Sequence, residues 1–370
     1  MQATLSRLVS GAGAVVDRAA LLVMQRAFAT GGDERTPADA RTVLERVAEA
    51  YGRPEHFADP DSFFRPPPLP TPRTRQVREL PGGGAVWDLE WRSSYEPFLP
   101  SYRDEHQRYA ANLIAHARWY RLPRPRAALV ALHGWGGGTW AFEERAFVVR
   151  TWLRAGLDVV LFQLPFHGRR TPRGTRSGLL FPSSHVVRTN EAFAQTIFDL
   201  RALAALLADR DLPTVGAIGM SLGGYATALW ASVTRDLGFA VPMIPAVSFA
   251  DLLWRHGEGS RARRRAEERG VSHALLEQVF RVHAPLERAP LVPHDARFII
   301  AGRGDRITPP DQAERLWQHW DRPSIHWFPG GHLAQAGRGD AFRALRRFLV
   351  ERGFATPRST HEPHEPRSPQ

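Results

Sequence analysis

Two chemically distinctive residue types are missing from this chain of 370 residues, which contains neither cysteine nor lysine. Without cysteine there is no disulfide bond, thiol nucleophile or cysteine-ligated zinc site, and either redox compartment is tolerated. Without lysine there is no Schiff-base chemistry, lysine general base or P-loop ATPase of the usual kind. Serine, histidine and the carboxylates remain as the groups able to carry chemistry.

Arginine accounts for all 49 basic residues, and the formal net charge is +11. Such an excess is typical of proteins that bind nucleic acid when it is clustered on one face or element. Here the arginines are spread along the chain. We therefore expect no nucleic-acid partner.

The first thirty residues carry apolar side chains at helical spacing. These are Leu5, Leu8, Val9, Ala12, Val15, Val16, Ala19, Leu22 and Val23. Asp17, Arg18 and Arg26 interrupt the run, so it is too broken for a membrane span or a secretory signal. AFA at 27–29 resembles a cleavage site and keeps export open as an alternative. We predict an amphipathic helix packed on the domain of a cytoplasmic protein, with peripheral membrane contact as the other alternative.

Three regions are predicted along the chain. Residues 1–72 read as a helical extension that ends in the proline-rich linker RPPPLPTP at 65–72. In residues 73–355, short β-branched and aromatic runs alternate with helical stretches from residue 127 onward, which predicts an α/β fold with a doubly wound, mostly parallel sheet. Residues 356–370 are rich in proline, serine, histidine and glutamate and are predicted to be disordered.

The strands and helices are expected at the following positions. Strands are predicted at about 74–80, 85–92, 111–120, 127–132, 158–164, 214–218, 241–247, 297–301 and 324–328, and helices at 143–155, 190–209, 222–236, 310–320 and 339–352. Two long stretches break the alternation, one after the strand at 158–164 and the other at 248–296. Both leave from the carboxyl ends of strands, where ligands bind in such sheets, so we predict that they wall the site and that 248–296 is a lid-like insertion.

A serine lies between two glycines in GAIGMSLGGYA at 216–226, directly after an apolar run. The hydroxyl of Ser221 attacks weakly unless an imidazole takes its proton and a carboxylate orients that imidazole. On an open α/β sheet the three groups follow strands in the order serine, acid, histidine. Asp305 follows FIIAG, and His332 follows IHWF within PGGHLAQ. Upstream, HGWGGG at 133–138 offers backbone N–H groups that could face a developing oxyanion.

With these motifs the chain resembles an α/β-hydrolase over residues 74–352. More narrowly, it resembles a little-studied branch that includes eukaryotic α/β-hydrolase-domain proteins. The shared segments are His133 to Gly138, Pro165 to Gly168, Gly219 to Gly224, Pro242 to Pro245 and Gly330 to His332.

The resemblance implies a role for each matched residue. Ser221 would be the nucleophile, His332 the general base and then acid, and Asp305 the carboxylate that orients it. The oxyanion hole would consist of the backbone N–H of Leu222 and one from the turn of Gly134 to Gly136, for which Trp135 is preferred.

Each role has an alternative. Ser221 could be a structural turn residue, and Asp251, which follows the strand ending near Val247, could be the acid in place of Asp305. The histidines that compete with His332 are His133, His167, His185 and His326.

Apolar side chains in the two long stretches predict the lining of the pocket. Phe166, Leu180, Phe249 and Trp254 are its principal candidates, and such a lining favours acyl chains over peptides. The arginine-rich helix at 261–270 is predicted to be a solvated face, with recognition of an anionic headgroup as the alternative.

Together these features predict a serine hydrolase that cleaves a carboxylic ester, preferably lipophilic, through an acyl-enzyme. The chemistry requires no metal and no organic cofactor. An acyltransferase with the same triad and a non-catalytic binding protein with the hydrolase fold remain alternatives. The natural substrate and the oligomeric state are left open.

Overall fold

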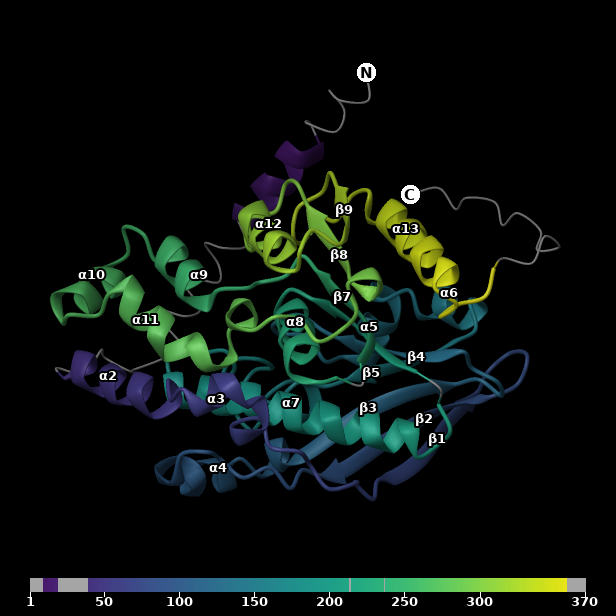
Figure 1. Ribbon diagram of the computed structural model, residues 1–370, viewed down its shortest axis with the longest axis horizontal. Coiled ribbons are helices and arrows are strands. Elements are labelled where there is room, and N and C mark those ends of the chain that lie inside the picture. The colour runs from purple at the N-terminus through teal and green to yellow at the C-terminus, as the bar shows by residue number, and fades with distance from the viewer. Residues whose placement is uncertain (1–8, 19–38, 213, 236, 358–370) are drawn as a thin grey trace.

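The computed structural model describes residues 9–18, 39–212, 214–235 and 237–357, which are organised around one nine-stranded sheet (Figure 1). The strands are β1 (Arg73–Glu79), β2 (Ala85–Arg92), β3 (Ile114–Arg121), β4 (Ala127–Leu132), β5 (Leu157–Phe162), β6 (Val215–Met220), β7 (Leu237–Met243), β8 (Phe298–Gly302) and β9 (Ser324–Phe328). Their order is β1-β2-β3-β5-β4-β6-β7-β8-β9. The pairings from β1 to β5 are antiparallel and those from β5 to β9 are parallel. The predicted doubly wound, mostly parallel α/β sheet is confirmed.

The central strands are almost entirely apolar because they are buried on both faces. Every residue of β4, β5 and β8 is buried. One charged residue, Asp158, lies within β5, and its carboxylate accepts hydrogen bonds from the Trp119 indole (2.7 Å) and the Leu122 amide (2.7 Å). These donors compensate for the loss of water, so the apolar strand tolerates the carboxyl group.

Helices pack against the sheet as the alternating pattern predicts. They are α5 (Trp140–Ala146), α6 (Val149–Arg154), α7 (Val186–Ala208), α8 (Leu222–Val233), α12 (Pro310–His319) and α13 (Arg338–Glu351), with a short α4 (Arg103–Arg108) before β3. The single helix predicted at 143–155 is wrong, because Val148 takes a positive φ of 47° and divides it into α5 and α6. A β-branched residue with this φ cannot continue a right-handed helix.

The described part of the N-terminal extension shares the hydrophobic core of the sheet domain. It includes α2 (Ala40–Tyr51) and α3 (Glu55–Ala58). Tyr51, Phe63 and Phe64 are all buried, and the Tyr51 hydroxyl donates to Glu191 Oε1 on α7 at 2.6 Å. The domain boundary at residue 72 stays a prediction. Residues 358–370, predicted to be disordered, lie outside the described residues.

The insertion at 248–296 forms three short helices at one side of the sheet, α9 (Phe249–His256), α10 (Arg261–Glu268) and α11 (His273–Phe280) (Figure 1). Helix α2 packs against α11. In the part of the chain that the structure describes, no helix is both long enough and apolar enough to cross a membrane.

Candidate active site

Ser221 occupies a sharp turn between β6 and α8, with φ 58° and ψ −111°. The flanking glycines are required because the chain passes very close to itself. A Cβ at Gly219 would lie 1.9 Å from the Gly223 carbonyl oxygen, and one at Gly223 would lie 2.0 Å from the Leu132 carbonyl oxygen at the end of β4. The Ser221 amide donates to the Met243 carbonyl at 2.9 Å and fixes the turn against β7. This geometry explains the G-x-S-x-G spacing.

Asp305 and His332, predicted from separate loops, are hydrogen-bonded to each other. His332 Nδ1 lies 2.7 Å from Asp305 Oδ2, and both residues are buried. Asp305 Oδ1 accepts from the amides of Ile307 (2.9 Å) and Thr308 (2.8 Å), and the Thr308 hydroxyl donates to Oδ2 at 2.9 Å. Because the carboxylate is held from several sides, the Nδ1 proton of His332 points to it and Nε2 is left as the basic nitrogen.

The environment of His332 has opposing effects on its protonation. Burial lowers the pKa of the imidazole. The charge and hydrogen bond of Asp305, with a smaller contribution from Asp17, raise the pKa by a larger amount. The net effect leaves the pKa of His332 above its ordinary value. The imidazolium form is therefore favoured, as a base that must hold a proton during a reaction requires.

The loop that carries His332 is tied to the residue before Ser221. Gln335 Nε2 donates to the His332 carbonyl at 2.8 Å and lies 3.5 Å from the sulfur of Met220. Ser221 is half-buried, and its hydroxyl has no hydrogen-bonded partner among the described residues. The hydrogen bond between a nucleophile and its base is often long or poorly aligned until a substrate binds.

Two of the predicted oxyanion donors flank the serine. A Cβ at Gly134 would lie 3.5 Å from the Ser221 Cβ, so the 133–138 turn passes directly beside it. Leu222 is the first residue of α8, where a backbone N–H has no acceptor within the helix. The Trp135 indole donates to the Gly178 carbonyl at 2.8 Å, which anchors the same turn from the other side.

The histidines that compete with His332 have other contacts. His133 Nε2 accepts from the Leu164 amide (3.1 Å), so Nδ1 carries the proton toward the Gly134 carbonyl (2.8 Å). Burial lowers the pKa of His133 to about 4, which suits this neutral tautomer. His167 packs against His133, His185 Nδ1 accepts from an amide at the start of α7, and His326 lies within β9.

The alternative acid, Asp251, is engaged by partners other than His332. Its Oδ1 pairs with His273 Nε2 at 2.6 Å, and its Oδ2 pairs with the guanidinium of Arg315. Together with Glu277, Asp251 and His273 form a group that could hold a metal ion. The Arg315 guanidinium already neutralises part of that charge, so the arrangement is explained without a cation.

The four predicted pocket residues do not share one environment. Phe249 packs on Tyr225 of α8 with a ring separation of 4.7 Å, close to the serine turn. Phe166 is 1% exposed and packs edge-on against Tyr109, so its place in the lining of a pocket stays a prediction. Leu180 is half-buried, and Trp254, also half-buried, is covered by the Arg263 guanidinium at 4.3 Å.

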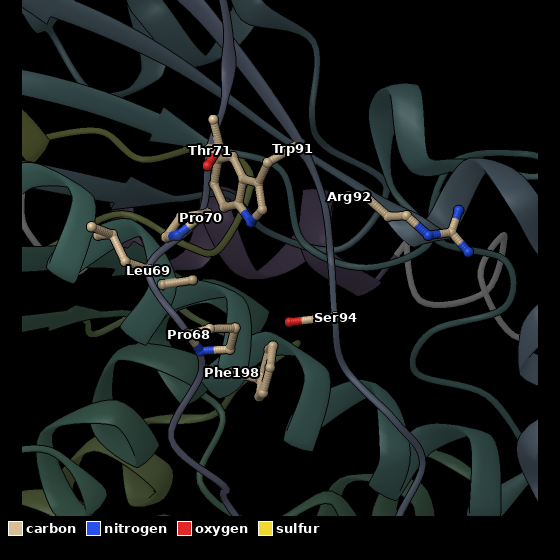
Figure 2. Close-up of a pocket in the computed structure, with 9 residues that line it drawn as sticks. Pro68, Leu69, Pro70, Thr71, Trp91, Arg92, Ser94 and Phe198 are labelled. Atoms are coloured by element: carbon tan, nitrogen blue, oxygen red, sulfur yellow. The ribbon is translucent and has the colours of Figure 1, made fainter.

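The hollow shown in Figure 2 lies away from the serine, beneath the proline-rich linker. It has a volume of about 210 Å³, and none of the four predicted pocket residues lines it. Residues 68–70 of the linker pass beside Trp91 and Phe198, whereas Arg92 points away (Figure 2). A second hollow of about 470 Å³ opens beside it and is lined by β1, β2 and β3 together with Arg169. Neither hollow provides the predicted apolar acyl pocket.

Sequence reasoning missed Asp17, whose side chain contacts the loops of both Asp305 and His332. Asp17 reads in the sequence as an interruption of the apolar N-terminal helix, yet its carboxylate accepts hydrogen bonds from the amides of His332 and Arg306. The local signal in the sequence is an acidic residue within a largely apolar helical run. The structure buries this residue on the same side as Gly13 and Ala14. Nothing local identifies its distant partners.

Comparisons with known proteins agree with this fold. Residues 105–266 match the family described as alpha/beta hydrolase domain containing 18. An uncharacterized protein of Mycobacterium tuberculosis, Rv2627c, is 33% identical over 320 residues, covering 80% of this chain and 73% of that protein. Acetyl xylan esterase 1 from Thermoanaerobacterium has a similar structure, with a TM-score of 0.55 and 16% identity over 82% of this chain and 98% of the esterase. An acetyl xylan esterase from Paenibacillus has a TM-score of 0.56 and 15% identity with the same coverage.

Proposed function

Since this chain belongs to the alpha/beta hydrolase domain containing 18 family, we propose that it is a serine hydrolase that cleaves a carboxylic ester through an acyl-enzyme. One observation carries the proposal. The His332 imidazole is hydrogen-bonded to the buried Asp305 carboxylate at 2.7 Å, on the loops after β9 and β8, while Ser221 occupies the strained turn after β6. These are the three positions at which such a sheet presents a nucleophile, its base and the carboxylate that orients the base.

The reaction begins when Ser221 Oγ attacks the ester carbonyl and His332 Nε2 takes the hydroxyl proton. Asp305 stabilises the resulting imidazolium, and the backbone N–H groups of Leu222 and the 134–136 turn stabilise the oxyanion. The imidazolium then protonates the leaving alkoxide, and the alcohol departs from an acyl-serine. Water, deprotonated by the same imidazole, attacks that ester and forms a second tetrahedral intermediate. When this intermediate collapses, the imidazolium returns its proton to Ser221 Oγ, so the acid is released and the serine is restored.

A lipophilic ester is the proposed substrate class. Three large apolar side chains on elements that adjoin the site loops in the sequence are more than half exposed: Phe142, Leu253 and Leu333. Phe142 follows the 133–138 turn, Leu253 belongs to α9, and Leu333 comes directly after His332. Apolar surface of this kind is available to an acyl chain and offers no hydrogen bonds to a peptide.

The experiment is covalent labelling of the purified protein with a fluorophosphonate probe, followed by mass spectrometry of the modified peptide. We expect labelling at Ser221 that is lost in Ser221→Ala and in His332→Ala. His326→Ala is the matched control, because this histidine lies within β9 and should leave labelling intact. Absence of labelling in the folded wild-type protein, with or without liposomes, would refute the proposal. Chain length is then tested with a series of p-nitrophenyl esters, for which we expect faster turnover of the longer acyl groups.

A further inference from the structure

The N-terminal helix, residues 9–18, lies against the loops that carry His332 and Asp305. In Figure 1 it is the purple helix near β9. The Ser10 hydroxyl donates to the Pro329 carbonyl at 2.7 Å. One turn further along, Gly13 is so close to the same loop that a Cβ there would lie 2.5 Å from the Gly331 amide nitrogen. One face of the helix therefore follows the loop between β9 and His332.

The same face ends in a buried carboxylate, Asp17, which is 0% exposed. Its Oδ2 accepts from the His332 amide at 2.7 Å and from the Arg306 amide at 3.0 Å, and its Oδ1 accepts from the Leu333 amide at 3.0 Å. No cationic side chain contacts it among the described residues. Burying a charge is costly unless hydrogen bonds compensate, and here backbone amides supply them.

These three amides belong to both loops of the acid–base pair. Arg306 follows Asp305 directly, His332 is the base itself, and Leu333 follows it. We propose that Asp17 is a positioning residue, whose single carboxylate holds the loop of the acid and the loop of the base in register so that the 2.7 Å contact between them forms. The inference rests on the proposed function and assigns to the N-terminal helix a part in that same site.

The charge of Asp17 also acts on the imidazole. Among the residues that the structure describes, three titratable groups influence His332: Asp305 from the loop after β8, Asp17 from the N-terminal helix and His256 from α9. Asp17 favours the imidazolium and raises the pKa of His332. A base deprotonates its nucleophile only when neutral, so a raised pKa places the rise of activity at higher pH. Removal of this charge therefore moves that rise to lower pH.

Asp17→Asn keeps the size of the side chain and removes its charge. With either orientation of the amide, its NH₂ group must face at least one of the three backbone N–H donors, so one or two contacts become repulsive. We expect the maximal rate of Ser221 labelling to fall by roughly tenfold to a hundredfold, as small displacements of catalytic groups commonly cause. We also expect the rise of rate with pH to shift to lower pH, which a purely structural role would not produce.

A pair of glycines tests the docking of the helix separately. Gly13→Ala places a methyl group against the Gly331 backbone and changes no charge, whereas Gly11→Ala places the same group where nothing lies within 4 Å. We expect Gly13→Ala to slow labelling at least about tenfold and Gly11→Ala to label as the wild type does. The two variants have equal helix propensity changes, so their difference reports the contact alone.

The measurement is the pH dependence of fluorophosphonate labelling for the wild type and the three variants, with thermal melting to verify folding. Wild-type rates and an unchanged pH profile in Asp17→Asn, together with equal rates in the two glycine variants, would overturn the role of Asp17. If Asp17→Asn does not fold, the labelling rates of Gly13→Ala and Gly11→Ala test the inference: slower labelling in Gly13→Ala alone supports it, and equal rates overturn it. If the wild type is never labelled, the proposed function fails, and NMR titration of the His332 imidazole then tests Asp17 alone: a lower pKa in Asp17→Asn supports the inference, and an equal pKa refutes it.

Discussion

Asp305→Asn tests the hydrogen bond between the Asp305 carboxylate and His332 while keeping the contacts of Asp305 with its own loop. The wild-type Oδ1 accepts from the amides of Ile307 and Thr308, while Oδ2 faces His332 Nδ1 at 2.7 Å. An asparagine of the same size keeps its oxygen toward the two amides. Its NH₂ group then faces His332 Nδ1, to which it can only donate a hydrogen bond.

The consequence is a change of tautomer. His332 then favours the tautomer with its proton on Nε2, the nitrogen that should accept the proton of Ser221, although the Thr308 hydroxyl also lies 3.0 Å from Nδ1. In a protease triad the same substitution lowers kcat by about 10⁴-fold, which corresponds to about 5.4 kcal/mol at 1.36 kcal/mol per factor of ten. We expect a loss of that order here, without loss of the fold. Loss of the negative charge also lowers the pKa of His332, because Asp305 is the main group that raises it.

The assay is the rate of fluorophosphonate labelling at Ser221, or of ester hydrolysis once a substrate is found. Asp251→Asn is the matched control, since Asp251 is the alternative acid and contacts His273 and Arg315 instead of His332. We expect this control to react within about twofold of the wild type, a change of less than 0.5 kcal/mol. If Asp251→Asn abolished labelling and Asp305→Asn did not, the assignment of the acid would be refuted.

Three further predictions concern stability and its dependence on pH. Ser221 holds an unusual backbone conformation (φ 58°, ψ −111°) that disfavours a side chain, so Ser221→Gly should be more stable than Ser221→Ala by about 1 kcal/mol in urea unfolding; the reverse order would contradict this. Asp199 and Arg170 form a fully buried ion pair at 2.8 Å, and Asp199→Ala should cost about 3–5 kcal/mol because it leaves the guanidinium unpaired; a loss below about 1 kcal/mol would count against it. Burial raises the pKa of Glu143 to about 7, so between about pH 4.5 and pH 7 the folded state holds a proton that the unfolded chain has lost. The free energy of unfolding therefore declines as the pH rises through this range. Glu143→Gln should flatten that decline by up to about 3 kcal/mol between pH 4.5 and pH 8, and an unchanged slope would show that Glu143 is ionised in the folded protein.

Local sequence was sufficient to predict most of the sheet and the order of the candidate site. β4, β5 and β8 are short, largely apolar and buried. Short apolar runs that alternate with helical stretches are typical of the buried strands of a parallel sheet. Ser221, Asp305 and His332 each follow a strand directly, and the parallel pairing from β5 to β9 brings the ends of those strands to one edge. The motif itself therefore encoded the proximity of these loops.

Other features depend on contacts that leave no local pattern. Asp17 is separated from Arg306 and His332 by 289 and 315 positions, and its partners are backbone amides, which every residue except proline possesses. The break between α5 and α6 arises from the positive φ of Val148, which residue propensity argues against. Phe166 was predictable as apolar, but only packing beneath Tyr109 decides whether it reaches solvent.

The two described parts of the N-terminal extension contact different parts of the domain. The helix at 9–18 holds the loops of Asp305 and His332, whereas α2 packs on α11 of the insertion predicted as a lid. That insertion is in turn joined to the helix after Ser221, because Phe249 packs on Tyr225 and the Tyr225 hydroxyl lies 2.6 Å from His283 Nδ1. A displacement of the extension can therefore reach the Asp305–His332 pair through Asp17, and the serine turn through α11 and the residues that it packs against, Phe249 and His283. In the proposed reaction, the effect of the extension on the labelling rate of Ser221 should then be separable from its effect on stability.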